Sequence, residues 1–294
     1  MTLPATDCAF EGFCLTRRAP KALLAWALAY GVFFTLFFLV AAPHLVTVMS
    51  LVTALEGNSN PSIEEIQPLM QAYGAMFAWG MPLAILFGAV LNTAIARSVI
   101  RPDDKQFGYL RVGKAELRVL AVNLIVAVIT GLAAMVVFAV VSVIAAIAVT
   151  VPALWLVVVL LSLAGLALII WLTVRLSLAV PITFAEGRIA VKESFAMTRG
   201  VFWPMLGMAI IAWIMALLVA LLGSAVAAPL SLLVGGMDRL AGLENAGVAQ
   251  MLRMAGPALA VSLVVNAVLS AAQIAIMYAP FSAVYLHLKG APRG

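Results

Sequence analysis

The chain has few charged side chains for its length of 294 residues. Only 10% of its residues are Asp, Glu, Lys or Arg, whereas 65% are hydrophobic. Soluble domains carry about 25% charged residues, so this composition excludes an ordinary soluble domain. The mean hydropathy of +1.17 supports the same conclusion. We therefore expect an integral membrane protein.

Residues that build metal centres and catalytic sites are also scarce. The chain has two histidines, His44 and His287, and two cysteines, Cys8 and Cys14. There is no His-Glu-x-x-His or paired-cysteine spacing, no Gly-x-Ser-x-Gly and no phosphate-binding glycine loop. The two thiols are expected to stay reduced on a cytosolic segment. The sequence thus predicts a protein that is not an enzyme and that binds no cofactor or metal.

Long uncharged segments dominate the rest of the chain. A helix needs about 20 apolar residues to cross about 30 Å of hydrocarbon. Five uncharged segments exceed this length: residues 22–55, 66–96, 119–174, 200–237 and 254–288. The third is long enough for two spans, with a turn at residues 150–153. Because the segments are continuous rather than alternating, a β-barrel is excluded.

These segments predict an all-α fold, a polytopic transmembrane helical bundle of six spans arranged as three hairpins. Short interfacial helices are expected on the cytosolic side. A cytosolic segment (1–21) precedes the transmembrane domain (22–288), and a cytosolic tail (289–294) follows it. The expected spans are residues 23–42, 73–95, 119–149, 154–180, 205–227 and 258–286.

Local signals refine some helix ends. Apolar character continues beyond Pro43 to Leu55, so the first helix is expected to extend outward. Ser62 and Glu65 have the spacing of a capping box, which predicts the start of the second helix. A plain turn is expected at residues 57–61, and a longer loop at residues 229–256.

The amino-terminal segment has two interpretations. Asp7 could cap a short interfacial helix that carries Phe10, Phe13 and Cys14 on one side. Alternatively, the segment is an irregular terminus.

The basic residues are distributed unequally between the two sides of the expected bundle. With the amino terminus inside, fifteen of the 17 lysines and arginines face the cytosol, and only Arg239 and Arg253 lie outside. Cytoplasmic loops are enriched in Lys and Arg, so this bias predicts that both termini are cytosolic. It also accounts for the net charge of +5 without a nucleic-acid partner. We expect a multi-pass protein of a bacterial inner membrane.

Residues 188–199 are predicted to form a surface helix on the cytosolic side. Arg188, Lys192 and Arg199 fall on one helical face, and Gly200 can end the helix. This face could hold the headgroup of an anionic lipid, or it could simply follow the positive-inside bias. The three side chains are candidate lipid headgroup contacts.

Arg175 lies near the cytosolic end of the fourth expected span, which Pro181 is expected to close. Its long side chain could reach the interface alone, or it could pair with Glu186 across the turn. Burying either charge alone would cost several kcal/mol. Arg175 and Glu186 are therefore a candidate structural ion pair.

Amide side chains are the main polar groups inside the expected spans. The candidate intramembrane polar contacts are Asn92, Asn123, Asn266 and Gln273. Such groups usually form hydrogen bonds between helices, and a transport pathway is the alternative. No Asp, Glu or Lys lies deep in any expected span, which disfavours a proton-coupled carrier.

A family resemblance rests on residues around Arg175. The pattern comprises Arg175, Pro181, Glu186, Gly187, Ser194, Thr198, Arg199, Gly200, Phe202 and Trp203. It resembles uncharacterised bacterial six-span membrane proteins that are similar to the membrane domain of some glycerophosphoryl diester phosphodiesterases. Residues 109–113 with Glu116, and residues 285–288, fit the same resemblance. The resemblance implies a helical membrane module without an agreed activity. The sequence contains no soluble phosphodiesterase domain, so no hydrolytic residues are carried over.

The leading functional hypothesis is a non-enzymatic membrane module that organises lipid, mainly anionic lipid, or a partner protein. The alternative is a small transporter or permease-like subunit. A polar cavity lined by the four amides would favour the transporter. A solid core of Leu, Val and Ala would favour the module.

Overall fold

The computed structural model describes residues 5–55, 62–233 and 248–290. Its elements are α1 (Ala5–Ala9), α2 (Glu11–Arg18), α3 (Pro20–Leu55), α4 (Ile63–Ile100), η1 (Gln106–Tyr109), α5 (Lys114–Ala148), η2 (Pro152–Leu154), α6 (Trp155–Leu176), α7 (Ala179–Glu186), α8 (Val191–Met197), α9 (Phe202–Leu233) and α10 (Val248–Leu288). Six helices in the described ranges are long and apolar enough to cross a membrane. The predicted fold class, an all-α polytopic bundle, is confirmed.

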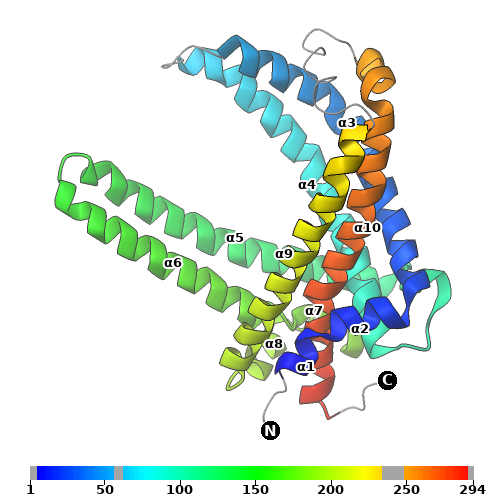
Figure 1. Ribbon diagram of the computed structural model, residues 1–294. Helices are drawn as coiled ribbons and strands as arrows, with labels where there is room; N and C mark the ends of the chain where they lie inside the picture. The colour runs from blue at the N-terminus through cyan, green and yellow to red at the C-terminus, as the bar shows by residue number, and fades with distance from the viewer. Residues whose placement is uncertain (1–4, 56–61, 234–247, 291–294) are drawn as a thin grey trace.

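Three helical hairpins diverge from a common end of the molecule. They are formed by α3 with α4, α5 with α6, and α9 with α10 (Figure 1). The common end carries both described chain ends, the short helices α1, α2, α7 and α8, and the loop between α4 and α5. We call it the basic end, because Arg101, Lys105, Arg111 and Lys192 belong to these segments and Arg199 follows directly after α8.

The largest packed core lies toward the basic end. It joins α3, α4, α7, α9 and α10 through buried side chains that include Trp26, Ile95, Ile182, Met205 and Val284. By contrast, the most apolar stretch of α5 has 0% of its residues buried. Lipid tails are as apolar as these side chains, so the outer parts of the hairpins need no protein partner. Contacts at the basic end therefore hold the three hairpins together.

Several helix ends follow the local signals in the sequence. The Ser62 side chain accepts a hydrogen bond from the Glu65 N–H, and the Ser62 N–H donates to the Glu65 carboxylate at 2.8 Å. The predicted capping box is thus confirmed. α3 continues through Pro43 to Leu55, as expected.

Two expected connections fall partly or wholly outside the described residues. The expected turn at residues 57–61 is one of them, and Arg239 also lies outside the described ranges. The expected loop at residues 229–256 is helical at both of its ends, because α9 reaches Leu233 and α10 begins at Val248.

A break between two helices lies within the fourth expected span. α6 stops at Leu176, and Pro181 lies in the first turn of α7. A proline in a first turn removes no hydrogen bond of the helix, because the N–H groups there have no helical acceptor. Pro181 therefore begins a separate short helix instead of closing the span.

The amino-terminal segment forms two helices, not the single capped helix that was the first interpretation. Asp7 lies inside α1, and Phe10 precedes α2 without a side-chain cap. Phe10 and Cys14 are exposed, whereas Gly12 and Leu15 face the protein.

The reason for this orientation is the close approach of α2 to α10. A Cβ added at Gly12 would overlap the Cα of Ile276 and lie 2.8 Å from the carbonyl oxygen of Ala275. Glycine alone permits this backbone contact. As a result, α2 is packed against α10 instead of lying free on the membrane surface (Figure 1).

Candidate functional site at the basic end

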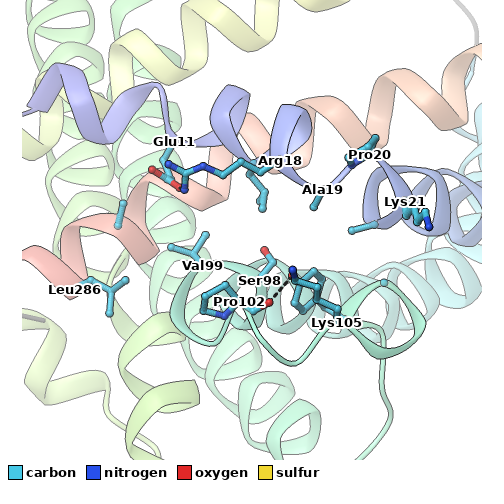
Figure 2. A pocket seen from close by; sticks show the side chains of 15 residues that line it. Glu11, Arg18, Ala19, Pro20, Lys21, Ser98, Val99, Pro102, Lys105 and Leu286 are labelled. Carbon is cyan, nitrogen blue, oxygen red and sulfur yellow. Dashed lines mark hydrogen bonds and ion pairs between the residues drawn. The ribbon is translucent and has the colours of Figure 1, made fainter. Parts of the chain in front are cut away.

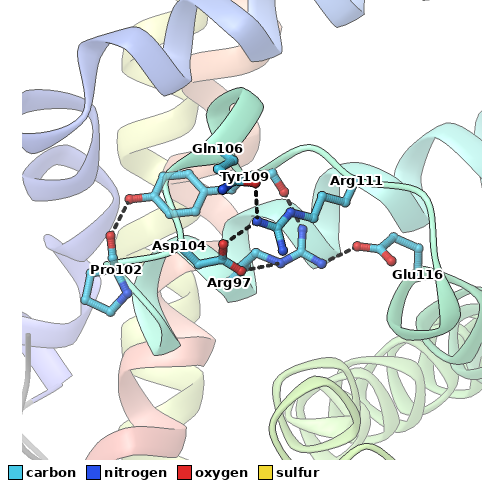
Figure 3. A network of polar contacts seen from close by, with 7 residues as sticks. All are labelled: Arg97, Pro102, Asp104, Gln106, Tyr109, Arg111 and Glu116. Atoms are coloured by element: carbon cyan, nitrogen blue, oxygen red, sulfur yellow. Dashed lines mark hydrogen bonds and ion pairs between the residues drawn. The ribbon is translucent and has the colours of Figure 1, made fainter.

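A buried ion pair joins α4 to α5 at the basic end. Arg97 is in the last turn of α4, and Glu116 is in the first turn of α5. Both side chains are 6% exposed, and the Arg97 guanidinium donates a hydrogen bond to the Glu116 carboxylate. It also donates to the backbone carbonyl oxygen of Tyr109 (Figure 3). Each charge thus compensates the burial of the other, since either one alone would be strongly destabilising.

This pair was not predicted from the sequence, because Arg97 was counted only among the fifteen basic residues expected on the cytosolic side. A signal was present, because Arg97 follows directly on an uncharged segment and belongs to the same helix. Glu116 is also the only acidic residue between Asp104 and Glu186. An isolated acid at the start of a span is a reason to look for a buried basic partner.

The loop between α4 and α5 folds around the Arg97 side chain. Asp104 accepts a hydrogen bond from Arg111, and its carboxylate lies 3.9 Å from the Arg97 Nε. The Tyr109 hydroxyl donates to the carbonyl oxygen of Pro102 at 2.9 Å (Figure 3). These contacts give the loop a defined shape although it contains only the short helix η1.

A left-handed turn attaches the loop to α3. Phe107, Gly108 and Tyr109 have φ angles of 51°, 64° and 66°. The indole N–H of Trp26 donates to the carbonyl oxygen of Gly108 at 2.8 Å. A Cβ at Gly108 would lie 2.5 Å from the Cβ of Ala25. Gly108 is therefore suited to this turn both by its backbone freedom and by its lack of a side chain.

The aromatic ring of Phe184 links α7 to this network. The guanidinium carbons of Arg97 and Arg101 lie 5.4 and 5.3 Å from the ring centroid. Such cation–π contacts contribute about 0.5–2 kcal/mol each, depending on exposure. They place α7 against the end of α4.

Arg175 does not pair with Glu186, so the candidate ion pair is corrected. The Arg175 guanidinium carbon instead lies 5.6 Å from the ring centroid of Trp171 and 5.9 Å from that of Phe202. Its Nε is buried without a hydrogen-bond partner among the residues that the structure describes. The pairing fails because α7 intervenes between the two residues, and Glu186 is at its far end.

Glu186 binds two other cations. Its carboxylate accepts from Arg188 at 2.8 Å and from Lys289 at 3.1 Å, so it connects α7 to the carboxyl end of the chain. The hydrogen bond to Glu186 raises the pKa of Lys289. Hydrogen bonds to Glu193 and Glu186 raise the pKa of Arg188.

Arg188, Lys192 and Arg199 do not share one helical face. α8 contains only Lys192, whereas Arg188 precedes the helix and Arg199 follows it. Arg188 pairs with Glu186 and Glu193. Lys192 and Arg199 are exposed, and neither forms an ion pair with any described residue. Two of the three candidate lipid contacts thus lack a described carboxylate partner.

Buried hydroxyl groups fix α8 in place. The Ser194 hydroxyl donates to the backbone carbonyl oxygen of Arg175 at 2.7 Å. The Thr183 hydroxyl accepts from the Ala190 N–H at 3.2 Å, just before α8 begins. Because these hydroxyls are in α7 and α8, a short helix of seven residues becomes anchored to both α6 and α7.

The four candidate intramembrane amides form no hydrogen bond with one another in the described part of the chain. Asn92 is 9% exposed, and its Oδ1 has no hydrogen-bond partner in the described part of the chain. Asn266 is exposed and donates to the Ser262 carbonyl oxygen of its own helix at 2.8 Å. Asn123 and Gln273 are half-buried.

Two cavities lie within the described residues, and the four amides line neither of them. The smaller, of about 160 Å³, is between α3 and α4 and has apolar walls that include Phe37 and Trp79. The larger, of about 440 Å³, is at the basic end between α2 and the loop that follows α4 (Figure 2). The polar cavity that would favour a transporter is therefore not one of these two.

Metal ligands do not converge in the described ranges, where no three His, Cys, Asp or Glu side chains form a metal-binding group. The chain matches no family model, no curated protein and no solved structure.

Proposed function

We propose that this membrane protein is a non-enzymatic module that organises anionic lipid at its basic end. The observation that carries the proposal is the state of Lys192 and Arg199, which are exposed and lack a carboxylate partner among the described residues. Each cation near an anionic membrane surface contributes about 1 kcal/mol of attraction. The two cations lie near the start and just beyond the end of α8, which buried hydroxyl groups hold in place.

The proposal includes an orientation and a family resemblance. The basic end faces the cytosol of a bacterial inner membrane, because Lys and Arg accumulate on the cytoplasmic side. The segment that carries the resemblance to the membrane domain of glycerophosphoryl diester phosphodiesterases includes Ser194 and Thr198, both fully buried. In this proposal Ser194 and Thr198 shape the lipid contact and take no part in catalysis.

A lipidomic comparison tests the proposal. The double variant Lys192→Gln/Arg199→Gln and the wild type are purified in a mild detergent, and the bound phospholipid is quantified by mass spectrometry. We expect about thirtyfold weaker retention of anionic lipid, from two contacts of about 1 kcal/mol each.

The matched control exchanges the two cations, as Lys192→Arg/Arg199→Lys, and should retain wild-type lipid. Equal lipid content in the wild type and the neutralised variant would contradict the proposal. Lys192 and Arg199 would then reflect only the enrichment of basic residues on the cytosolic side. Melting temperatures of all three proteins show that the comparison is made on folded material.

A further inference from the structure

The larger cavity has the size and the walls of a binding site. It lies between α2, the end of α4, the loop that follows α4, and the end of α10 (Figure 2). Leu15, Val99 and Leu286 contribute apolar walls from three of these elements. Small-molecule sites typically measure about 300–1,000 Å³ and are lined mainly by apolar side chains. The volume of about 440 Å³ is in the lower part of that range.

The charges around this cavity are mostly positive. Its lining includes Arg18, Lys21 and Lys105 and one carboxylate, Glu11. Glu11 lies 3.6 Å from Arg18 and offsets that charge (Figure 2). Lys21 and Lys105 are exposed and form no ion pair with the residues that the structure describes. An apolar interior is thus combined with uncompensated cations at its margin.

The cavity lies at the depth where a span begins. Pro20, Lys21 and Ala22 at the start of α3 line it, and the uncharged part of α3 follows directly. The start of a membrane span lies at the boundary between lipid headgroups and hydrocarbon. An amphiphile in the bilayer would therefore reach the cavity with its headgroup already at the level of Lys21.

The cavity walls are held in place by contacts already described. The close approach of Gly12 to Ile276 keeps α2 on α10. On the opposite wall, Gly108 accepts the hydrogen bond from Trp26, and Tyr109 accepts that from Arg97. A site formed before its ligand arrives loses less conformational entropy on binding.

We propose that this cavity binds an amphiphilic anion with a single hydrocarbon chain. The chain lies against Leu15, Val99 and Leu286, and Lys21 and Lys105 hold a phosphate or carboxylate headgroup. The modest volume favours one chain over two. The site uses residues other than Lys192 and Arg199, so it does not depend on the lipid contact proposed above.

Binding measurements on the full chain in nanodiscs of zwitterionic lipid test the assignment. The probes are oleoyl lysophosphatidylglycerol, oleate, the zwitterionic oleoyl lysophosphatidylcholine, and glycerol phosphate as a headgroup without a chain. We expect the two anionic amphiphiles to bind more tightly than the zwitterionic one, and glycerol phosphate to bind weakly. The relative affinities of the lysophospholipid and oleate distinguish a phosphate from a carboxylate headgroup.

Charge variants locate the site. Lys21→Gln/Lys105→Gln should weaken binding of the anionic probes about thirtyfold and leave the zwitterionic probe unchanged. Arg17→Gln is the matched control, because this exposed cation is next to the cavity in sequence but does not line it. Unchanged affinity in the double variant, or glycerol phosphate binding as tight as that of the lysophospholipid, would overturn the proposal. Lys192→Gln/Arg199→Gln should retain probe binding, which separates this proposal from the preceding one.

Discussion

Arg97 and Glu116, 19 residues apart in the chain, form a buried ion pair at the point where the second and third spans meet. The same guanidinium donates to the backbone of Tyr109, so a single side chain joins two helices and the loop between them. The pair thus organises the end of the molecule where the three hairpins converge.

Loss of either partner should destabilise the fold strongly. Arg97→Met and Glu116→Gln each leave a buried charge without its partner, at a cost of about 3–5 kcal/mol in the free energy of unfolding. The cost of the double variant Arg97→Met/Glu116→Gln should be clearly less than the sum of the two single costs, because no buried charge then lacks its partner. Denaturation in detergent measures all three values.

The control for this cycle is Asp104→Asn, since the Asp104 side chain is 32% exposed and lies 3.9 Å from Arg97. Its cost should be well below that of the buried pair. Additive costs for Arg97→Met and Glu116→Gln would contradict a direct coupling.

Gly12→Leu should release the amino-terminal helices from the bundle. Any side chain at this position overlaps the backbone of Ile276, so α2 has to move away from α10. Trypsin should then cleave after Arg17 or Arg18 faster than in the wild type. Cys14→Leu is the matched control, because Cys14 is exposed on the same helix. Equal cleavage rates in the two variants would argue against the close packing of α2.

Arg175 and Glu186 should behave as independent residues. Arg175 contacts the rings of Trp171 and Phe202, whereas Glu186 pairs with Arg188 and Lys289. The stability costs of Arg175→Ala and Glu186→Ala should therefore add within about 0.5 kcal/mol. A cost of the double variant well below the sum of the two single costs, measured by thermal denaturation, would show that Arg175 and Glu186 pair directly.

The sequence predicted six helices long and apolar enough to cross a membrane because segment length decides which helices can do so. It did not identify the partners of the charges. A cation at a helix end, such as Arg97 or Arg175, has the same pattern whether it faces solvent, a carboxylate or an aromatic ring. The nearest acid in sequence led to Glu186, although the fold placed Phe202 of α9 beside Arg175 instead. The contact partner of such a cation depends on the direction in which the short helices turn at the end of a hairpin. The spacing of apolar residues does not specify that direction.

The sequence also did not predict which side of the short helix α2 is buried. Gly12 and Leu15, not Phe10 and Cys14, form the buried side of α2. Hydrophobicity alone favoured the aromatic side, whereas close backbone packing selected the small residue.

The orientation of the basic end can be tested with cysteine labelling. In a background of Cys8→Ala and Cys14→Ser, a cysteine at Lys105 or Lys192 should react with an impermeant thiol reagent only after cell lysis. A cysteine at Asn58 should react in intact cells, because the positive-inside bias puts this position on the other side. Labelling of position 105 in intact cells would reverse the proposed topology.

The placement of the core at one end has a mechanical consequence. α5 and α6 contact the rest of the chain at the basic end, and the apolar stretch of α5 beyond it packs against α6 without burying any of its residues fully. Figure 1 shows the outer ends of the hairpins standing apart. In a bilayer, lipid would occupy the space between these outer ends. The contacts that fix the angles between the hairpins are therefore those at the basic end, where Arg97, Glu116 and the cavity lie.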